Sequence, residues 1–262
     1  MFKRLLNDSF TLVFWNLETV FKACGAWFVL QFVLLIATQM TLGGATDISA
    51  QPEAALSSHY LLLIVISTIF GVVSSSSISV AWHRFGLLGD VPGLIHLKVG
   101  AIEVRFILKS LLLFLIILAV FVPLSFVFGI ISGLFQMPLL MNGLLVITGV
   151  FFAPHFIRLY LMLPATAIER PIGVKQAHAL GKGLGWQMIG AMIILSLPFI
   201  LISFGLQYLL PLIAGSLPLL LIQFKILILN LLLQIIITVL GVSVITATYR
   251  IAMERVDNQD AE

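Results

Sequence analysis

The chain has 262 residues, of which 61% are hydrophobic and 10% are charged, and its formal net charge is +3. Soluble domains carry about 25% charged residues, so this composition excludes a soluble globular protein, a disordered chain and a disulfide scaffold. Apolar runs of about 20 residues match helices that cross a bilayer, whereas the strands of a membrane β-barrel alternate over about 10 residues. We therefore predict an all-α polytopic integral membrane protein.

Six transmembrane helices are predicted within a single membrane domain, residues 1–262, because clusters of glycine and proline separate the apolar runs. The predicted spans are Ala23–Leu42, Tyr60–Ala81, Phe106–Phe128, Met141–Tyr160, Gln187–Tyr208 and Ile226–Thr248, followed by a tail at 249–262. Lys225 is expected at the outer interface, where its side chain can reach water. The apolar, proline-broken stretch Leu209–Phe224 is then expected to lie on the outer face.

The positions of Lys and Arg predict the orientation. Thirteen of the 14 lie in the termini and in the loops on the same side of the membrane, and Lys225 is the exception. Because loops rich in Lys and Arg stay in the cytoplasm, both termini are expected to be cytoplasmic.

Amphipathic stretches precede every second span. Residues 2–22 place apolar side chains at helical spacing and charged side chains off that face, which predicts a helix lying in the cytoplasmic interface. Similar stretches occur at Gly93–Val104 and Pro171–Gly185. We interpret the chain as three hairpins, each preceded by an interfacial helix.

Each even-numbered span ends in an arginine with aromatic neighbours. This pattern fits either anchors at headgroup depth or a site for lipid phosphates or a partner protein. The candidate residues are Trp82, His83, Arg84, Arg158, Tyr160, Arg170, Lys182, Trp186, Tyr249 and Arg250. Acids follow these ends, so Asp90, Glu169 and Glu254 are candidate structural partners. The hypothesised ion pairs are Arg84–Asp90 and Arg158–Glu169.

The stretch Arg158-Leu-Tyr-Leu-Met-Leu-Pro-Ala-Thr-Ala-Ile-Glu169, followed by Ala177-His-Ala-Leu-Gly-Lys-Gly-Leu-Gly-Trp186, resembles a known family. It is similar to bacterial six-span proteins related to the membrane domain attached to some glycerophosphodiester phosphodiesterases. The Trp82-His83-Arg84 and Tyr249-Arg250 endings look similar too. The resemblance implies the bacterial inner membrane and a link to lipid or envelope homeostasis. It implies no phosphodiesterase activity, because the soluble catalytic domain is not part of this sequence.

Chemical motifs are scarce. His83, His96, His155 and His178 lack the spacing of metal ligands, so neither a metal nor another cofactor is expected. No catalytic motif and no mid-membrane carboxylate occurs, so we do not expect an enzyme. No basic stripe with interleaved aromatic residues suggests nucleic acid as a partner.

These features predict a non-enzymatic scaffold or accessory protein. Its basic cytoplasmic face would bind anionic membrane lipids or a larger membrane-protein complex. The alternative is a transporter for a lipid or small solute, which requires a polar cavity at mid-depth near Ser76, Asn230 or Gln234. Close helix packing is the other explanation of the serine run at residues 74–79.

Overall fold

The computed structural model describes residues 1–41, 58–213 and 219–260, and these ranges form α-helices and no strand. The helices are α1 (Phe2–Phe14), α2 (Leu17–Thr41), α4 (Ser58–Leu88), α5 (Ala101–Leu134), α6 (Pro138–Leu159), α7 (Met162–Ala167), α8 (Val174–Leu180), α9 (Gly185–Ile213) and α10 (Leu219–Asp260). Six segments of the described chain are long and apolar enough to cross a membrane. The predicted class is confirmed: the protein is an all-α polytopic membrane protein.

The predicted spans coincide with the long helices, but the helices are longer. Leu42 lies outside the described residues and Tyr160 directly follows α6; all other predicted span residues are helical. The helices continue because backbone hydrogen bonding does not stop where the hydrocarbon layer stops. The predicted tail is therefore helical as far as Asp260, and 261–262 lie outside the described residues.

The last hairpin differs from the expectation at its tip. Most of the stretch predicted to lie on the outer face is helical, because α9 continues to Ile213 and α10 begins at Leu219. Only residues 214–218 of that stretch lie outside the described chain. After Pro218 no proline interrupts the run, so α10 starts seven residues before the predicted span and Lys225 is exposed near its beginning.

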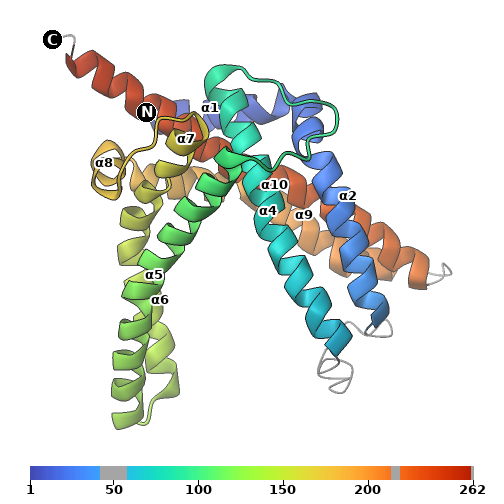
Figure 1. Ribbon diagram of the computed structural model, residues 1–262. Helices are drawn as coiled ribbons and strands as arrows, with labels where there is room; N and C mark the ends of the chain where they lie inside the picture. The colour runs from blue at the N-terminus through green and yellow to red at the C-terminus, as the bar shows by residue number, and fades with distance from the viewer. Residues whose placement is uncertain (42–57, 214–218, 261–262) are drawn as a thin grey trace.

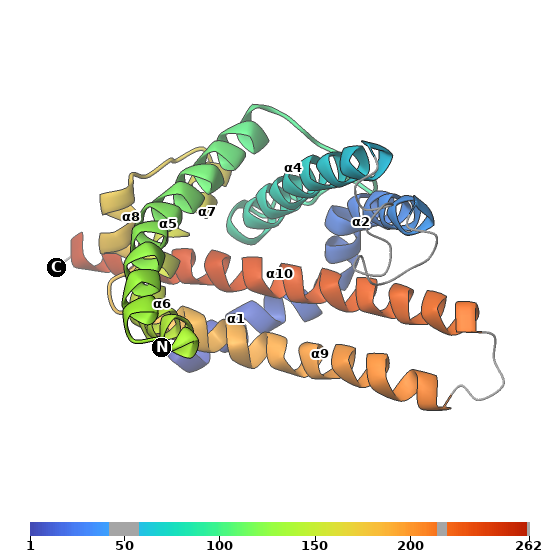
Figure 2. The ribbon, with the colours of Figure 1, turned by 90° about the horizontal axis from the view of Figure 1, so that it is seen from below.

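Consecutive long helices pack as three hairpins, α2/α4, α5/α6 and α9/α10. Figure 1 shows that the hairpins meet at one end, together with α1, α7 and both termini, and diverge toward the other. We call the end where they meet the packed end; it comprises residues 1–16, 82–106, 155–190 and 243–260. From below (Figure 2), α10 runs along the molecule between α9 and the α2/α4 pair, and it contacts α1 and α7 as well.

The buried side chains concentrate at and next to the packed end. All six residues of α7 are buried, and Leu5 of α1, Phe106 of α5 and Met188 of α9 belong to the same cluster. Away from this end the hairpins expose large apolar side chains; Phe126, for example, is 71% exposed. Such surface suits contact with lipid chains, which are as apolar as the side chains themselves.

The expected interfacial helices are present only in part. Residues 2–22 are split, because α1 ends at Phe14 and Leu17 already begins the first spanning helix. No helix occupies Gly93–Gly100: α4 ends at Leu88, Gly89 follows it with a φ of +77°, and α5 starts at Ala101. Pro92 and the neighbouring glycines disfavour helix there. Within Pro171–Gly185 only the seven residues of α8 are helical before α9 begins.

Candidate functional site

Arg84 is the centre of an ion-pair cluster at the packed end. Its guanidinium lies 2.7 Å from Asp90 and 3.8 Å from Glu169, and it donates a hydrogen bond of 3.2 Å to the Ala167 carbonyl oxygen. The expected Arg84–Asp90 pair is therefore present, whereas Glu169 pairs with Arg84 and not with Arg158. Glu169 follows α7 with a φ of +59°, a left-handed conformation that is uncommon outside glycine. Arg84 thus ties the end of α4 to the end of α7.

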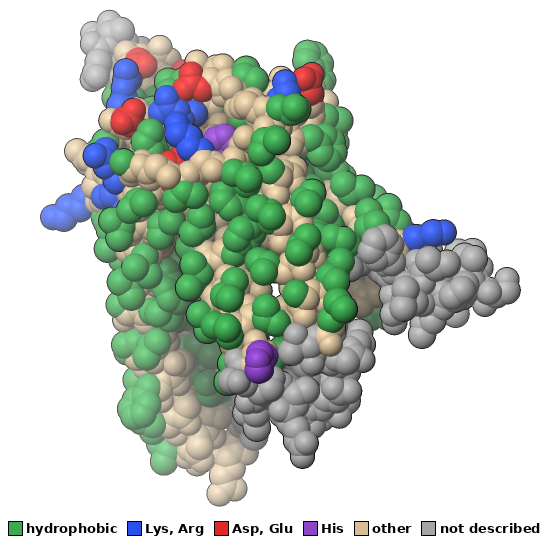
Figure 3. Space-filling model, turned by 45° about the vertical axis from the view of Figure 1, so that its right-hand side comes forward, with side chains coloured by type: hydrophobic (Ala, Val, Ile, Leu, Met, Phe, Trp, Pro, Cys, Tyr) green, Lys and Arg blue, Asp and Glu red, His purple; other side chains and the backbone are tan. Residues whose placement is uncertain are grey.

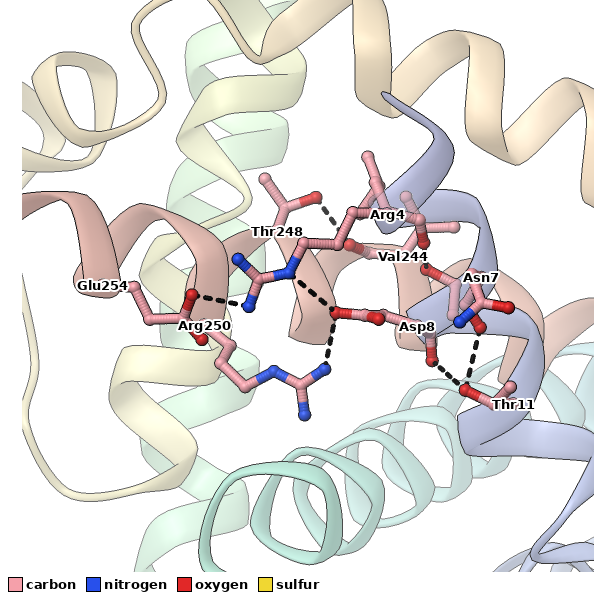
Figure 4. Close-up of polar contacts among 10 residues, drawn as sticks. Arg4, Asn7, Asp8, Thr11, Val244, Thr248, Arg250 and Glu254 are labelled. Atoms are coloured by element: carbon pink, nitrogen blue, oxygen red, sulfur yellow. Dashed lines mark hydrogen bonds and ion pairs between the residues drawn. The ribbon is translucent and has the colours of Figure 1, made fainter. Parts of the chain in front are cut away.

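A second cluster joins α1 to α10 and is drawn in Figure 4. Asp8 accepts a hydrogen bond of 2.8 Å from Arg250 and lies 3.7 Å from Arg4. Arg4 in turn lies 2.6 Å from Glu254. Glu254 was the expected acid of the α10 end, but its partner is on α1, and Arg250 pairs with an acid that the sequence analysis did not select. Arg250 and Glu254 lie one helical turn apart on α10, so α1 can bridge both.

The aromatic candidates at the ends of α4 and α10 are not exposed at the surface. Trp82 is 0% exposed and donates a hydrogen bond of 2.6 Å from its indole nitrogen to Ser243 of α10. His83 Nδ1 lies 2.8 Å from the Thr246 hydroxyl, and Tyr249 is also buried. Trp82, His83 and Tyr249 therefore lie inside the bundle, and their interpretation as ligand-binding residues stays a prediction. Their polar atoms or rings pack within the helix bundle and hold α4 against α10.

The end of α6 is different, because its cations have no acidic partner. Arg158 is partly buried. Its Nε atom is enclosed and has no hydrogen-bond partner in the described chain. Its stem covers Gly181, where a Cβ would come within 2.8 Å of the Arg158 Cβ. A similar contact follows at Gly185, where a Cβ would lie 2.3 Å from the Pro154 carbonyl oxygen. Only glycine allows α9 to start this close to α6.

The remaining candidates surround this connection. Tyr160 is partly buried, Arg170 and Lys182 are exposed, and Trp186 is 57% exposed. Figure 3 shows charged side chains gathered over the top of one face and apolar side chains covering the region below. Of the described cations, Arg4, Lys22, Arg84 and Arg250 form ion pairs, so the other candidates keep their charge free for a ligand.

A groove of about 780 Å³ lies between α5, α6 and α8. Phe151, Phe152 and Phe156 wall it, while Lys175 and two histidines line it as well. The rings of His155 and His178 stack with centroids 5.6 Å apart and planes 11° apart. Both histidines are visible in the sequence, but their contact across α6 and α8 depends on the tertiary fold.

A second, smaller cavity of about 290 Å³ lies under the loop between α4 and α5. Glu103, 2% exposed, lines it and accepts the Gly100 N–H at 2.8 Å. Burial lowers the pKa of His96, and Lys98 acts in the same direction, while Glu103 and a backbone hydrogen bond at Ser77 oppose the shift. The Ser77 hydroxyl also donates to the Lys98 carbonyl oxygen at 2.6 Å, which fixes the loop on α4.

A third cavity, of about 410 Å³, lies between α2, α4 and α10. Its polar lining consists of Gln31, Thr38, Ser67, Thr68 and Gln234. Gln234 was one of the residues expected at a polar cavity. The other two are elsewhere: Ser76 is buried and does not line this cavity, and Asn230 accepts a hydrogen bond of 2.6 Å from Ser203 of α9.

Two serines of the run at residues 74–79 have a packing role. Trp27 donates to Ser77 at 3.2 Å and Gln31 donates to Ser74 at 2.7 Å, so both serines join α4 to α2. Within the described ranges, no three His, Cys, Asp or Glu side chains lie close enough to hold a metal ion.

Comparison of the chain with known families, curated proteins and solved structures finds no match. The family resemblance of residues 158–186 therefore stays a prediction.

Proposed function

We propose that the protein is a non-enzymatic scaffold or accessory protein of the bacterial inner membrane that binds anionic phospholipid headgroups at its packed end. The packed end would face the cytoplasm with both termini, because it holds the Lys- and Arg-rich loops. The assignment to a bacterial inner membrane rests on the family resemblance.

One observation carries this proposal: the groove between α5, α6 and α8 combines an apolar wall with unpaired cationic and imidazole groups. Lys175 forms no ion pair with a described acid, and the His155 and His178 rings make no hydrogen bond with the described residues. A phospholipid presents the matching chemistry, since its acyl chain fits the phenylalanines and its phosphate accepts hydrogen bonds from Lys and His.

The test is native mass spectrometry of the protein released from nanodiscs that contain phosphatidylglycerol or phosphatidylcholine. We expect wild-type protein to retain phosphatidylglycerol preferentially and Lys175→Gln/His178→Gln to lose about tenfold of that preference, since a hydrogen bond to a charged group contributes about 1.5 kcal/mol. Lys3→Gln is the matched control, because Lys3 is an exposed cation on α1 without an ion pair. Equal retention of both lipids by wild type would refute the proposal.

Orientation is tested separately with translocation reporters. A reporter fused after Asp47 should be exported and one fused after Lys98 should remain in the cytoplasm. The reverse pattern would place the packed end outside and remove the cytoplasmic lipid proposal. Mass spectrometry of proteins that co-purify in mild detergent addresses the partner complex, and a stoichiometric partner bound over the groove would replace lipid as its occupant.

Transport of a lipid or small solute is the second candidate, and the cavity between α2, α4 and α10 favours it. Gln234 lines this cavity, as a transport path would require. The test is uptake or flipping by protein reconstituted in liposomes. Transport that is lost in Gln234→Leu and kept in Gln207→Leu, a substitution on α9 outside the cavity, would favour a transporter over a scaffold.

A further inference from the structure

We propose that the cavity between α2, α4 and α10 binds an uncharged amphiphile: a hydroxyl, ester or amide head carried on a hydrocarbon body. The cavity is distinct from the groove of α5, α6 and α8, so this inference does not depend on the binding of anionic lipid.

The position of the cavity is within the bilayer. Gln31 lies about 21 Å along α2 from Leu17, at 1.5 Å per residue. Ser67 and Thr68 lie in the half of α4 that is farther from the packed end. Polar side chains at this depth have no bulk water to bond with, so an unused donor or acceptor is costly.

Several hydrogen-bonding groups of the lining are unused. Gln234 is exposed and makes no hydrogen bond with the described residues, while the Ser67 hydroxyl is enclosed and finds no partner there. Gln31 spends one N–H on Ser74 and keeps its amide oxygen and second N–H. The hydroxyls of Thr38 and Thr68, by contrast, donate to the carbonyl oxygens four residues earlier. The groups left to bind a ligand are thus on the carboxamides of Gln31 and Gln234 and the hydroxyl of Ser67. Together they supply hydrogen-bond donors and acceptors.

The lining also defines the charge and shape of the occupant. Among the described residues, no Lys, Arg, Asp or Glu lines the cavity, so no described side chain would neutralise an ionised head. The rest of the wall is apolar, namely Leu34, Leu35, Ile64, Phe70 and Leu231.

The cavity borders the lipid-facing surface. Leu35 and Ile64, which line it, are both among the exposed apolar residues. A hydrocarbon chain can therefore lie along α2 and α4 in the bilayer while its head reaches Gln31, Ser67 and Gln234. This geometry admits a single-headed neutral lipid from the side and requires no passage through the packed end.

The test uses three photoreactive probes of equal chain length, a diazirine-bearing alcohol, fatty acid and alkane, added to the protein in nanodiscs. We expect the alcohol to label peptides of α2, α4 and α10 at least fivefold more than the alkane or the ionised acid. Excess unlabelled long-chain alcohol should compete. Equal labelling by alcohol and alkane would overturn the proposal, and so would preferential labelling by the acid.

Variants separate head recognition from simple chain packing. Gln234→Leu removes an amide that makes no hydrogen bond with the described residues, so it should fold normally and lower alcohol labelling to the alkane level. Gln31→Leu should also lower alcohol labelling to the alkane level. Gln207→Leu is the control, because it changes the same residue type outside the cavity. Undiminished alcohol labelling in a folded Gln31→Leu/Gln234→Leu protein would refute the proposal. Lys175→Gln should leave the alcohol labelling unchanged, which distinguishes this cavity from the anionic-lipid site.

Discussion

The ends of α4 and α6 carry the same sequence pattern but have different structures. At the end of α4, Arg84 is bound to two acids and a carbonyl oxygen, and the neighbouring Trp82 is buried. At the end of α6, Arg158 has no acidic partner, and the connection that follows leads to the exposed Trp186. The difference teaches that an aromatic-arginine ending has no fixed role. Where acidic side chains lie next to the arginine, it holds helices together. Where none lies next to it, its charge is available to a ligand.

The largest expected effect compares two tryptophans. Trp82→Ala should lower the free energy of unfolding by about 3–5 kcal/mol, because it removes a buried ring and leaves Ser243 without its donor. Trp186→Ala should change it by less than about 0.5 kcal/mol, since that side chain is mostly exposed. Chemical or thermal unfolding in detergent measures both. Equal effects would mean that the two ends are not structurally different.

The next comparison is between two arginines. Arg84→Ala should cost about 2 kcal/mol, because it strips partners from Asp90, Glu169 and the Ala167 carbonyl oxygen. Arg170→Ala, which breaks no ion pair, should cost little in stability. If Arg170 proved as costly as Arg84, the division into structural and free cations would be incorrect.

A smaller effect is expected where α1 meets α10. Arg4 and Arg250 are exposed, and Glu254 and Asp8 are partly buried, so Arg250→Ala should cost about 0.2–1 kcal/mol. Raising the ionic strength should reduce the difference between variant and wild type, because salt screens exposed pairs. A cost of several kcal/mol that is insensitive to salt would indicate that this cluster is buried in the functional state.

The smallest effect concerns pH and the loop between α4 and α5. Because the folded protein lowers the pKa of His96, the unfolded chain binds more protons near pH 6. His96 thus contributes stability above its ordinary pKa of 6.5, and this contribution is lost as the pH falls below it. His96→Asn should flatten that part of the stability–pH curve. An unchanged curve in His96→Asn would contradict the shift.

The elements that sequence analysis predicted well are those governed by local composition. The six spans and the segregation of basic residues follow from the cost of placing charge in hydrocarbon, a property that each segment carries by itself. The helix predicted at Gly93–Val104 begins only at Ala101. Hydrophobic periodicity did not outweigh the helix-breaking effect of Pro92 and the glycines. The short helix α7 was missed because six residues are too few to distinguish a buried helix from the end of a span.

The candidate site was predictable only as a set of residue types. Arg84–Asp90 lies within six residues and could be paired from the sequence, whereas Glu169 reaches Arg84 across 85 positions and Arg4 reaches Glu254 across 250. No local pattern contains these contacts.

The sequence by itself determined that the chain is a six-span helical membrane protein with its positive charge gathered on one side, because transfer between water and lipid is nearly additive over residues. Only the tertiary structure decided which arginines are neutralised, which aromatic rings are buried, and where polar groups face a cavity. These outcomes depend on which helices pack together, and helices drawn from opposite ends of the chain make the decisive contacts.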